Sequence, residues 1–387
     1  MSQMVKAALS LAPGKIEIRE FPMPKLTKGS AIVKVNLAGI CGTDKHYFKG
    51  ETKQGAGTLN AINIPFPLVQ GHENVVTIWD IDDEGSKKLD FDGNILKPGD
   101  RVTMCPDVVC GDCYYCKHIP NYPWCNKLQF GYGSIPADSD TKLYGGFAEY
   151  MYIAPGTRLY KVPEGLPDTM AVLTEPMCVT YSLDKAKEFY SFAGEGFGFG
   201  DTVVIQGVGP LGLTHVIKAR MLGAGKIIVF DISEYKLEMA KAFGADVLVN
   251  SSTTTTEERI ELVKQETRGI GADIAVDCTG VPEVIPEGLE MLRKAGMFIE
   301  CGLFVDMGPT QINMHMVCAK NLRIIGMYNH SHVDYSRTMD MMLRNIDNFP
   351  WMKFISGVYP LDKTAQAIKK SMSPESMKIV INPWMNA

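Results

Sequence analysis

Four cysteines, Cys110, Cys113, Cys116 and Cys125, follow one another with the spacing C-x2-C-x2-C-x8-C. Thiolates this close in sequence favour a tetrahedral, all-cysteine zinc site, because the metal offsets their mutual repulsion. An iron–sulfur cluster, or a lobe that folds without metal, is the alternative. Four thiolate ligands leave no open coordination position, so we expect this zinc to be structural.

A second set of possible metal ligands is spread along the chain, at Cys41, His72, Glu73 and Glu175. Zinc that takes part in a reaction keeps three protein ligands and one exchangeable position. Each residue alone also has a structural interpretation, as a buried thiol, a core histidine or a carboxylate at a helix N-terminus. Their joint occurrence with a nucleotide-binding pattern favours a catalytic metal site.

That nucleotide-binding pattern is Gly207-x-Gly209-x-x-Gly212, between a predicted strand at 203–205 and a predicted helix at 211–222. The first glycine permits a tight turn, and the second lets a pyrophosphate approach the backbone. The third glycine lets the helix pack against the strand, with its N-terminus facing the phosphates. The pattern predicts a dinucleotide site.

Asp231 follows the next predicted strand, at 227–230. A carboxylate at this place binds the ribose hydroxyls and repels a 2′-phosphate. We therefore expect NAD rather than NADP, although Lys236 is positioned to cover the adenosine ribose of either cofactor.

The order of apolar runs and turn residues predicts two kinds of domain. Short β-rich runs in the first part predict a barrel-like domain. After about residue 201, strands alternate with helices, which predicts an α/β domain with a doubly wound parallel sheet. The predicted strands are 32–35, 75–78, 101–104, 203–205, 227–230, 247–249, 274–277, 297–301 and 379–381, and the predicted helices are 211–222, 235–243, 257–266 and 284–292.

Composition excludes several classes of protein. The chain has 387 residues and a net charge of −5, which disfavours binding to a nucleic-acid backbone. The N-terminus carries only a short apolar stretch, and we find no run of about eighteen apolar residues, so we expect a cytoplasmic protein that binds no membrane.

The cysteines outside the two metal sets are expected to be buried thiols: Cys105, Cys178, Cys278, Cys301 and Cys318.

These motifs together resemble the zinc-dependent medium-chain dehydrogenases over nearly the whole chain. The resemblance rests on Cys41-Gly42-Thr43-Asp44, Gly71-His72-Glu73, Pro98-Gly99-Asp100-Arg101-Val102, the four-cysteine lobe, Glu175-Pro176, the glycine pattern and Asp231. Glu-Pro at the third ligand position is similar to the polyol (sorbitol) and threonine dehydrogenase branch, and Cys178 is a reserve candidate for that ligand.

The resemblance implies a GroES-like β-rich catalytic domain built from residues 1–176 and 327–387, with a structural zinc lobe at about 105–130. A Rossmann NAD-binding domain is implied at 177–326. It also implies two zinc ions per chain, NAD as cofactor and a homodimer or homotetramer. The implied cofactor-binding residues are Gly207, Gly209, Pro210, Leu211, Gly212, Asp231, Lys236, Gly302 and Leu303.

The implied activity is hydride transfer between NAD and a secondary alcohol, such as a polyol or a sugar-derived alcohol. Zinc would activate the hydroxyl, and Thr43 and His46 would relay its proton. Asp44 and Glu73 would orient His72, and Glu73 is the alternative to Glu175 as ligand. The alternative functions are an NADP-linked ketone or aldehyde reductase, a catalytically silent nucleotide-binding member and a zinc-free quinone-reductase relative.

The chain departs from the family pattern at two kinds of place. The last cysteine interval is x8 where the family usually has x7. Extra residues also occur at 53–64, 85–94 and 189–199. The family's loop positions and substrate fit therefore do not transfer to this sequence.

Overall fold

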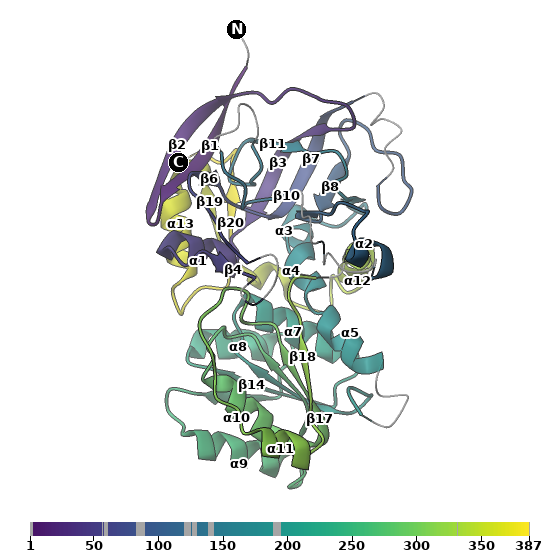
Figure 1. Cartoon of the computed structure of the whole chain (residues 1–387), viewed down its shortest axis with the longest axis vertical. Helices are drawn as coiled ribbons and strands as arrows, with labels where there is room; N and C mark the ends of the chain where they lie inside the picture. The colour runs from purple at the N-terminus through teal and green to yellow at the C-terminus, as the bar shows by residue number, and fades with distance from the viewer. Residues whose placement is uncertain are drawn as a thin grey trace. The chain divides into compact units, whose positions relative to one another are not determined.

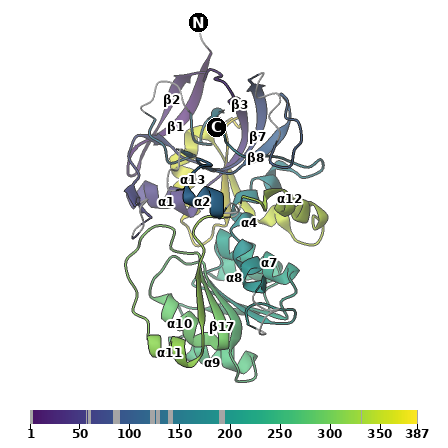
Figure 2. The same cartoon turned by 45° about the vertical axis from the view of Figure 1, so that its right-hand side comes forward.

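The computed structural model describes residues 3–55, 57, 61–82, 90–119, 125, 130–137, 143–188, 195–330 and 332–386. The chain divides into two compact units (Figures 1 and 2). Unit 1 comprises Met1–Cys178 and Ser331–Ala387, and unit 2 comprises Val179–His330. The domain boundaries expected from the sequence, after residues 176 and 326, lie two residues before the end of the first segment of unit 1 and four residues before the end of unit 2.

Unit 1 is built on a sheet with the order β12-β8-β7-β3-β20-β19, in which β11 also pairs with β3. Figure 1 shows strands from both ends of the chain, purple β3 and yellow β20, in this sheet. Its strands are β3 (Ala31–Gly39), β7 (Glu73–Ile81), β8 (Arg101–Met104), β11 (Tyr150–Ile153), β12 (Leu159–Lys161), β19 (Ile355–Pro360) and β20 (Lys378–Asn382). The four strands predicted for this unit all lie within these bounds, which confirms the β-rich prediction.

Smaller elements complete unit 1. A three-stranded sheet has the order β2-β1-β6, and two two-stranded sheets pair β4 with β5 and β9 with β10. These strands are β1 (Met4–Ala12), β2 (Lys15–Pro22), β4 (Lys53–Gln54), β5 (Ile62–Asn63), β6 (Leu68–Val69), β9 (Asp107–Val108) and β10 (Phe130–Gly131), and the helices are α1 (Gly42–Lys49), α2 (Tyr114–His118), α3 (Asp168–Ala171), α4 (Thr174–Cys178), α12 (Tyr335–Arg344) and α13 (Thr364–Ser371). Of the extra segments, residues 56, 58–60, 85–89 and 189–194 lie outside the described residues.

Unit 2 contains a six-stranded sheet with the order β15-β14-β13-β16-β17-β18, and every pairing in it is parallel. This order confirms the doubly wound prediction and puts the topological switch between β13 and β16. The strands are β13 (Thr202–Gln206), β14 (Lys226–Asp231), β15 (Val247–Asn250), β16 (Ala272–Asp277), β17 (Leu292–Glu300) and β18 (Arg323–Gly326), and the helices are α5 (Tyr181–Glu188), α7 (Pro210–Met221), α8 (Glu234–Ala242), α9 (Thr256–Glu266), α10 (Val284–Met291) and α11 (Met314–Ala319).

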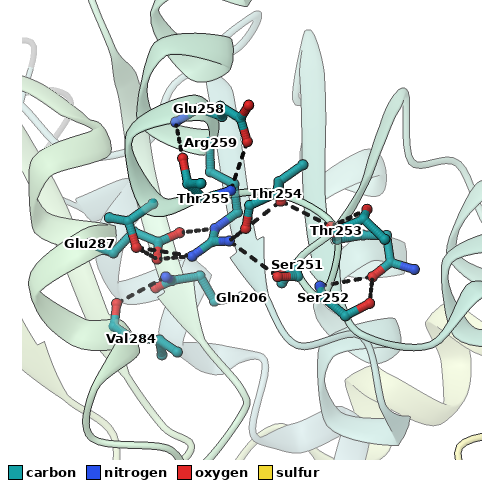
Figure 3. Close-up of polar contacts among 12 residues, drawn as sticks. Gln206, Ser251, Ser252, Thr253, Thr254, Thr255, Glu258, Arg259, Val284 and Glu287 are labelled. Carbon is teal, nitrogen blue, oxygen red and sulfur yellow. Dashed lines mark hydrogen bonds and ion pairs between the residues drawn. The ribbon is translucent and has the colours of Figure 1, made fainter.

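An Arg–Glu pair fixes the turn after β15 (Figure 3). Arg259 on α9 donates from Nε and Nη2 to the two carboxylate oxygens of Glu287 on α10, each at 2.6 Å. Its Nη1 donates to the carbonyls of Ser251 (3.2 Å) and Thr254 (2.5 Å). The Ser251 N–H in turn donates to the Asp231 carbonyl (2.9 Å). The pair therefore holds this turn beside the end of β14, where Asp231 stands.

The expectation that all five remaining cysteines are buried is wrong for two of them. Cys318 is exposed, because it lies on α11, which buries none of its residues. Cys278 is half-buried at the end of β16, whereas Cys105, Cys178 and Cys301 are buried.

Within the described ranges, no helix has the length and hydropathy needed to cross a membrane.

Candidate active site

The register of two antiparallel strands brings possible metal ligands together in unit 1. Gly39 at the end of β3 is paired with Glu73 at the start of β7. Cys41 lies two residues after the end of β3 and caps α1, while His72 directly precedes β7. The segments that carry these two side chains are therefore neighbours, although they are far apart in sequence.

Asp44 ties the two ligand segments to each other. Its carboxylate accepts hydrogen bonds from the Cys41 N–H (2.8 Å), the Gly71 N–H (3.2 Å) and Gln70 Nε2 (3.3 Å). The side chain is 1% exposed, and this burial raises the pKa of the Asp44 carboxyl. Asp44 thus links the backbone that precedes His72 to the backbone at Cys41.

The electrostatics of the cluster favour a bound cation. Burial alone would lower the pKa of His72, but the hydrogen bond to Cys41 and the charges of Cys41, Asp44 and Glu175 hold that pKa well above its ordinary value. Burial raises the pKa of the Glu175 carboxyl on α4, and the charge of Glu73 raises it further. The negative groups around His72 therefore outweigh the positive charge that an imidazolium could supply, and a bound metal cation would offset them.

Cys41, His72 and Glu175 supply a thiolate, an imidazole and a carboxylate, a donor set that suits zinc. The residues present therefore fit a zinc ion. The three ligand atoms of this set do not all lie within 4.8 Å of one another. Two other groups among the described residues do meet that distance, the four cysteines of the lobe and the set of His215, Cys278 and Cys301. Cys178, the reserve candidate, is buried, and its Sγ is 3.6 Å from Thr338 Oγ1.

Glu73 is engaged by a lysine that the sequence did not point to. Lys378 Nζ, at the start of β20, donates to Glu73 Oε1 (2.7 Å) and Oε2 (2.5 Å), and also to the Ile40 carbonyl (3.3 Å). Lys378 is 2% exposed and Glu73 is 1% exposed. Burial alone would lower the pKa of Lys378, but Glu73 and Cys41 raise it above its ordinary value. Both carboxylate oxygens of Glu73 are thus occupied by an ammonium group.

Thr43 and His46 both lie on α1. Thr43 is buried, and its Oγ1 is 3.8 Å from Cys41 Sγ. His46 is half-buried, and its Nδ1 is 2.5 Å from Glu51 Oε2, just beyond the helix. Glu51 is a residue that the sequence reasoning missed, and its side chain is 36% exposed.

The four cysteines of the lobe lie close together around α2. Cys116 Sγ is 3.5 Å from Cys113 Sγ and 3.9 Å from Cys110 Sγ, and the Cys110 N–H donates to Cys125 Sγ (3.3 Å). All four sulfurs lie within 4.8 Å of one another. A tetrahedral ion with metal–sulfur distances of about 2.3 Å would separate its ligands by about 3.8 Å, so these thiols fit one zinc ion.

The glycine turn of unit 2 connects β13 to α7. Gly207 has φ +81°, a left-handed conformation that favours glycine, and a Cβ on Gly212 would lie only 1.9 Å from the Gly207 carbonyl oxygen. A Cβ on Gly209 would meet no atom within 4 Å. The turn is therefore closely packed at its first and third glycines and open at the second, as a bound pyrophosphate requires.

The remaining expected cofactor residues stand near the ends of parallel strands. Asp231 Oδ2 accepts from the Val208 N–H in the glycine turn, and its Oδ1 accepts from the Ser233 N–H, both at 2.9 Å. The N–H groups of Gly302 (2.9 Å) and Leu303 (3.0 Å), after β17, donate to Glu300 Oε1. Pro210 and Leu211 form the first turn of α7, and Lys236 lies half-exposed in the first turn of α8.

Comparison with known proteins identifies the family. Residues 27–164 match the alcohol dehydrogenase GroES-like domain, and residues 210–344 match the zinc-binding dehydrogenase domain. The chain is a zinc-dependent medium-chain dehydrogenase. This confirms the expected family and GroES-like fold and shows that the protein is an enzyme of the alcohol dehydrogenase type.

The dehydrogenase is similar to several named proteins along nearly its whole length. It is 29% identical to 5-exo-hydroxycamphor dehydrogenase from Pseudomonas putida, over 98% of this chain and 99% of the relative. It is 27% identical to sorbitol dehydrogenase from Bacillus subtilis, over 98% of both chains. A crystal structure of an alcohol dehydrogenase from Thermotoga maritima superposes with a TM-score of 0.86 at 28% identity, covering 98% of this chain and 100% of the other.

We expect the buried Lys378–Glu73 pair to stabilise unit 1 of the dehydrogenase. Lys378→Met leaves a buried carboxylate without its partner, which should lower the free energy of unfolding by about 3–5 kcal/mol. All four tryptophans, at 79, 124, 351 and 384, belong to unit 1. Tryptophan fluorescence during urea unfolding of the zinc-loaded protein therefore reports on this unit.

The control is Lys363→Met, which removes an exposed lysine of the same unit and should change that free energy by less than about 1 kcal/mol. Combining Lys378→Met with Glu73→Leu should recover much of the loss, because no charge then stays buried alone. Equal effects of the two lysine variants would show that the ion pair contributes nothing.

Proposed function

We propose that this dehydrogenase transfers a hydride between a secondary alcohol and NAD, with Cys41, His72 and Glu175 as the ligands of a catalytic zinc. The observation that carries the proposal is the cluster of a half-buried thiol, a half-buried imidazole and a buried carboxylate, whose negative charge raises the pKa of His72. Glu175 is preferred to Glu73 as a ligand because Lys378 occupies both oxygens of Glu73. The four-cysteine lobe is proposed to hold a second, structural zinc.

When bound, the zinc polarises the substrate hydroxyl so that its proton leaves near neutral pH, and the nicotinamide supplies the hydride acceptor. The role proposed for the chain's own residues is to hold and move that proton. The buried Thr43 hydroxyl beside Cys41 takes the proton up. His46, on the same helix and bonded to Glu51, receives it, and the half-exposed Glu51 carboxylate passes it to water.

Asp231 supports NAD as the cofactor. Its carboxylate is held at the glycine turn by the N–H groups of Val208 and Ser233. A fixed negative charge there accepts hydrogen bonds from ribose hydroxyls and repels a 2′-phosphate. The ammonium group of Lys236 could instead attract the 2′-phosphate of NADP, as the alternative NADP-linked reductase requires. The measured preference for NAD or NADP therefore decides between these two functions.

The substrate proposed is a polyol, a sugar-derived alcohol or a similar secondary alcohol. Similarity to sorbitol dehydrogenase supports a polyol, and similarity to 5-exo-hydroxycamphor dehydrogenase supports a cyclic alcohol. None of the ten cysteines, all of which lie among the described residues, forms a disulfide, which supports a reducing, cytoplasmic setting. Strand β18 ends the order of its sheet, and Ile324 on it is 44% exposed, which supports pairing with a second copy.

Metal analysis of the purified protein tests the two zinc sites. We expect about two zinc ions per chain, and about one in either Cys41→Ser or Cys113→Ser. Only Cys41→Ser should abolish turnover while leaving the lobe's zinc in place. A wild-type chain that holds one zinc or none would contradict this assignment.

A panel of secondary alcohols, polyols, inositols, amino-alcohol acids and steroid alcohols, assayed by NADH formation, tests the activity itself. With any substrate found, Thr43→Val should lower kcat by about 100-fold or more, because the proton then lacks its first acceptor. Thr43→Ser keeps the hydroxyl and should retain most of the activity, and both variants should keep their zinc. Unchanged turnover in Thr43→Val would eliminate the relay.

Replacing Asp231 tests the choice of cofactor. A hydrogen bond to a charged group contributes about 1.5–3 kcal/mol, so Asp231→Ala should weaken NAD relative to NADP by roughly tenfold or more. The ratio of kcat/KM for the two cofactors measures this preference. Glu238→Gln removes a charge from an exposed position on α8 and should leave the ratio unchanged. A ratio that stays the same in Asp231→Ala would show that this carboxylate does not select the cofactor.

A further inference from the structure

Two cysteines of unit 2 stand side by side at the ends of neighbouring strands. Cys278 follows β16 and Cys301 follows β17, and the last residues of these parallel strands, Asp277 and Glu300, are paired in register. Their Sγ atoms are 3.7 Å apart. Adjacent strands lie about 4.8 Å apart, and disulfides join Cα atoms separated by about 4.4–6.8 Å. The backbone therefore already allows a bond between these sulfurs.

The surroundings of the two sulfurs favour thiol chemistry. The hydrogen bond from Cys278 lowers the pKa of Cys301 below its ordinary value, and His215 lowers it further. Burial raises the pKa of Cys278 well above its ordinary value. One partner thus forms a thiolate more readily than a free cysteine, while the other stays a thiol. When protonated, Cys301 donates to the Asp277 carbonyl (3.0 Å).

His215, Cys278 and Cys301 together also satisfy the distance criterion for a metal-binding group. Both imidazole nitrogens, however, already have partners, since Nδ1 lies 2.9 Å from the Leu211 carbonyl and Nε2 lies 3.0 Å from Ser182 Oγ. The two sulfurs also lie beside different nitrogens, Cys278 at 3.7 Å from Nδ1 and Cys301 at 3.9 Å from Nε2. This arrangement favours a reaction between the sulfurs over a shared cation.

We propose that Cys278 and Cys301 are a modification site at which hydrogen peroxide forms a reversible disulfide. The Cys301 thiolate attacks one peroxide oxygen, the O–O bond breaks and hydroxide leaves, which gives a sulfenic acid. Cys278 then loses its proton and attacks that sulfur, the S–O bond breaks and water leaves. The two sulfurs supply two electrons to the peroxide, and a dithiol reductant reverses the reaction.

The site adjoins the residues expected to bind the dinucleotide. A Cβ built on Gly212 would lie 3.5 Å from Cys278 Cβ, and one on Gly207 would lie 3.2 Å from the Cys278 carbonyl carbon. Cys301 directly precedes Gly302. Bond formation shortens the sulfur–sulfur distance from 3.7 Å to about 2.0 Å. Because Cys278 lies directly against Gly207 and Gly212, the proposal includes that the shift of its side chain on bond formation changes the packing of the glycine turn and weakens dinucleotide binding.

Peroxide treatment of the reduced, zinc-loaded enzyme tests the proposal. After alkylation of the remaining thiols, peptide mapping by mass spectrometry should find Cys278 joined to Cys301, and dithiothreitol should release them. The Kd for NADH, followed by its fluorescence, should rise by roughly fivefold or more on oxidation and return on reduction. Zinc content is measured in parallel, because peroxide also attacks zinc-binding thiolates.

Three serine variants provide the comparison. Cys278→Ser and Cys301→Ser should each abolish the crosslink and the change in Kd. Cys318→Ser, at the exposed thiol of α11, should keep both. The proposal is overturned if peroxide leaves Cys278 and Cys301 unlinked, if the crosslink forms without a change in Kd, or if the wild-type chain holds a further zinc that Cys301→Ser loses. None of these readouts requires turnover, so they are independent of whether an alcohol substrate is found.

Discussion

The buried pair of Lys378 and Glu73 is the constraint on which the candidate active site depends. Its partners are separated by 305 residues in sequence, yet neither charge is tolerated alone in the interior. Lys378 begins β20, and Glu73 begins β7, on the two sides of β3. The first and last parts of the chain must therefore meet for Cys41, two residues after the end of β3, to be held in place.

That pairing leaves the neighbouring negative groups without a cation of their own. Lys378 is committed to Glu73 and to the Ile40 carbonyl. Cys41, Asp44 and Glu175 then act together on His72 and raise its pKa despite burial. A divalent cation satisfies this cluster better than a single proton on an imidazole, because it matches more than one negative ligand. Because Lys378 is committed to Glu73, the negative charge around His72 stays available for a metal ion.

How much the sequence predicts depends on whether the signal is local. The five strands and four helices predicted for unit 2 all overlap observed elements, because apolar runs and glycine turns are read over short windows. The prediction missed α5, α11 and β18, and β17 begins five residues before its predicted start. The sequence did not predict that Lys378 pairs with Glu73, that Glu51 bonds to His46 or that Gln70 bonds to Asp44. These contacts join residues whose types alone do not indicate a partner. Lys378 is one of many lysines until the register of β20 against β3 is known. Cys318 shows the converse, since its apolar character suggested burial on a helix that lies at the surface.

Parallel strands explain why unit 2 gathers chemistry at one edge. All six strands point the same way, so the residue after each strand emerges at the carboxyl edge of the sheet. The edge that presents Gly207 and Asp231 to a dinucleotide must also set Cys278 beside Cys301, since β16 and β17 are in register. His215 enters from α7, whose start the glycine turn itself fixes. A change in the bonding of the two thiols therefore acts on the glycine turn through direct contact, without any need for a longer route through the fold.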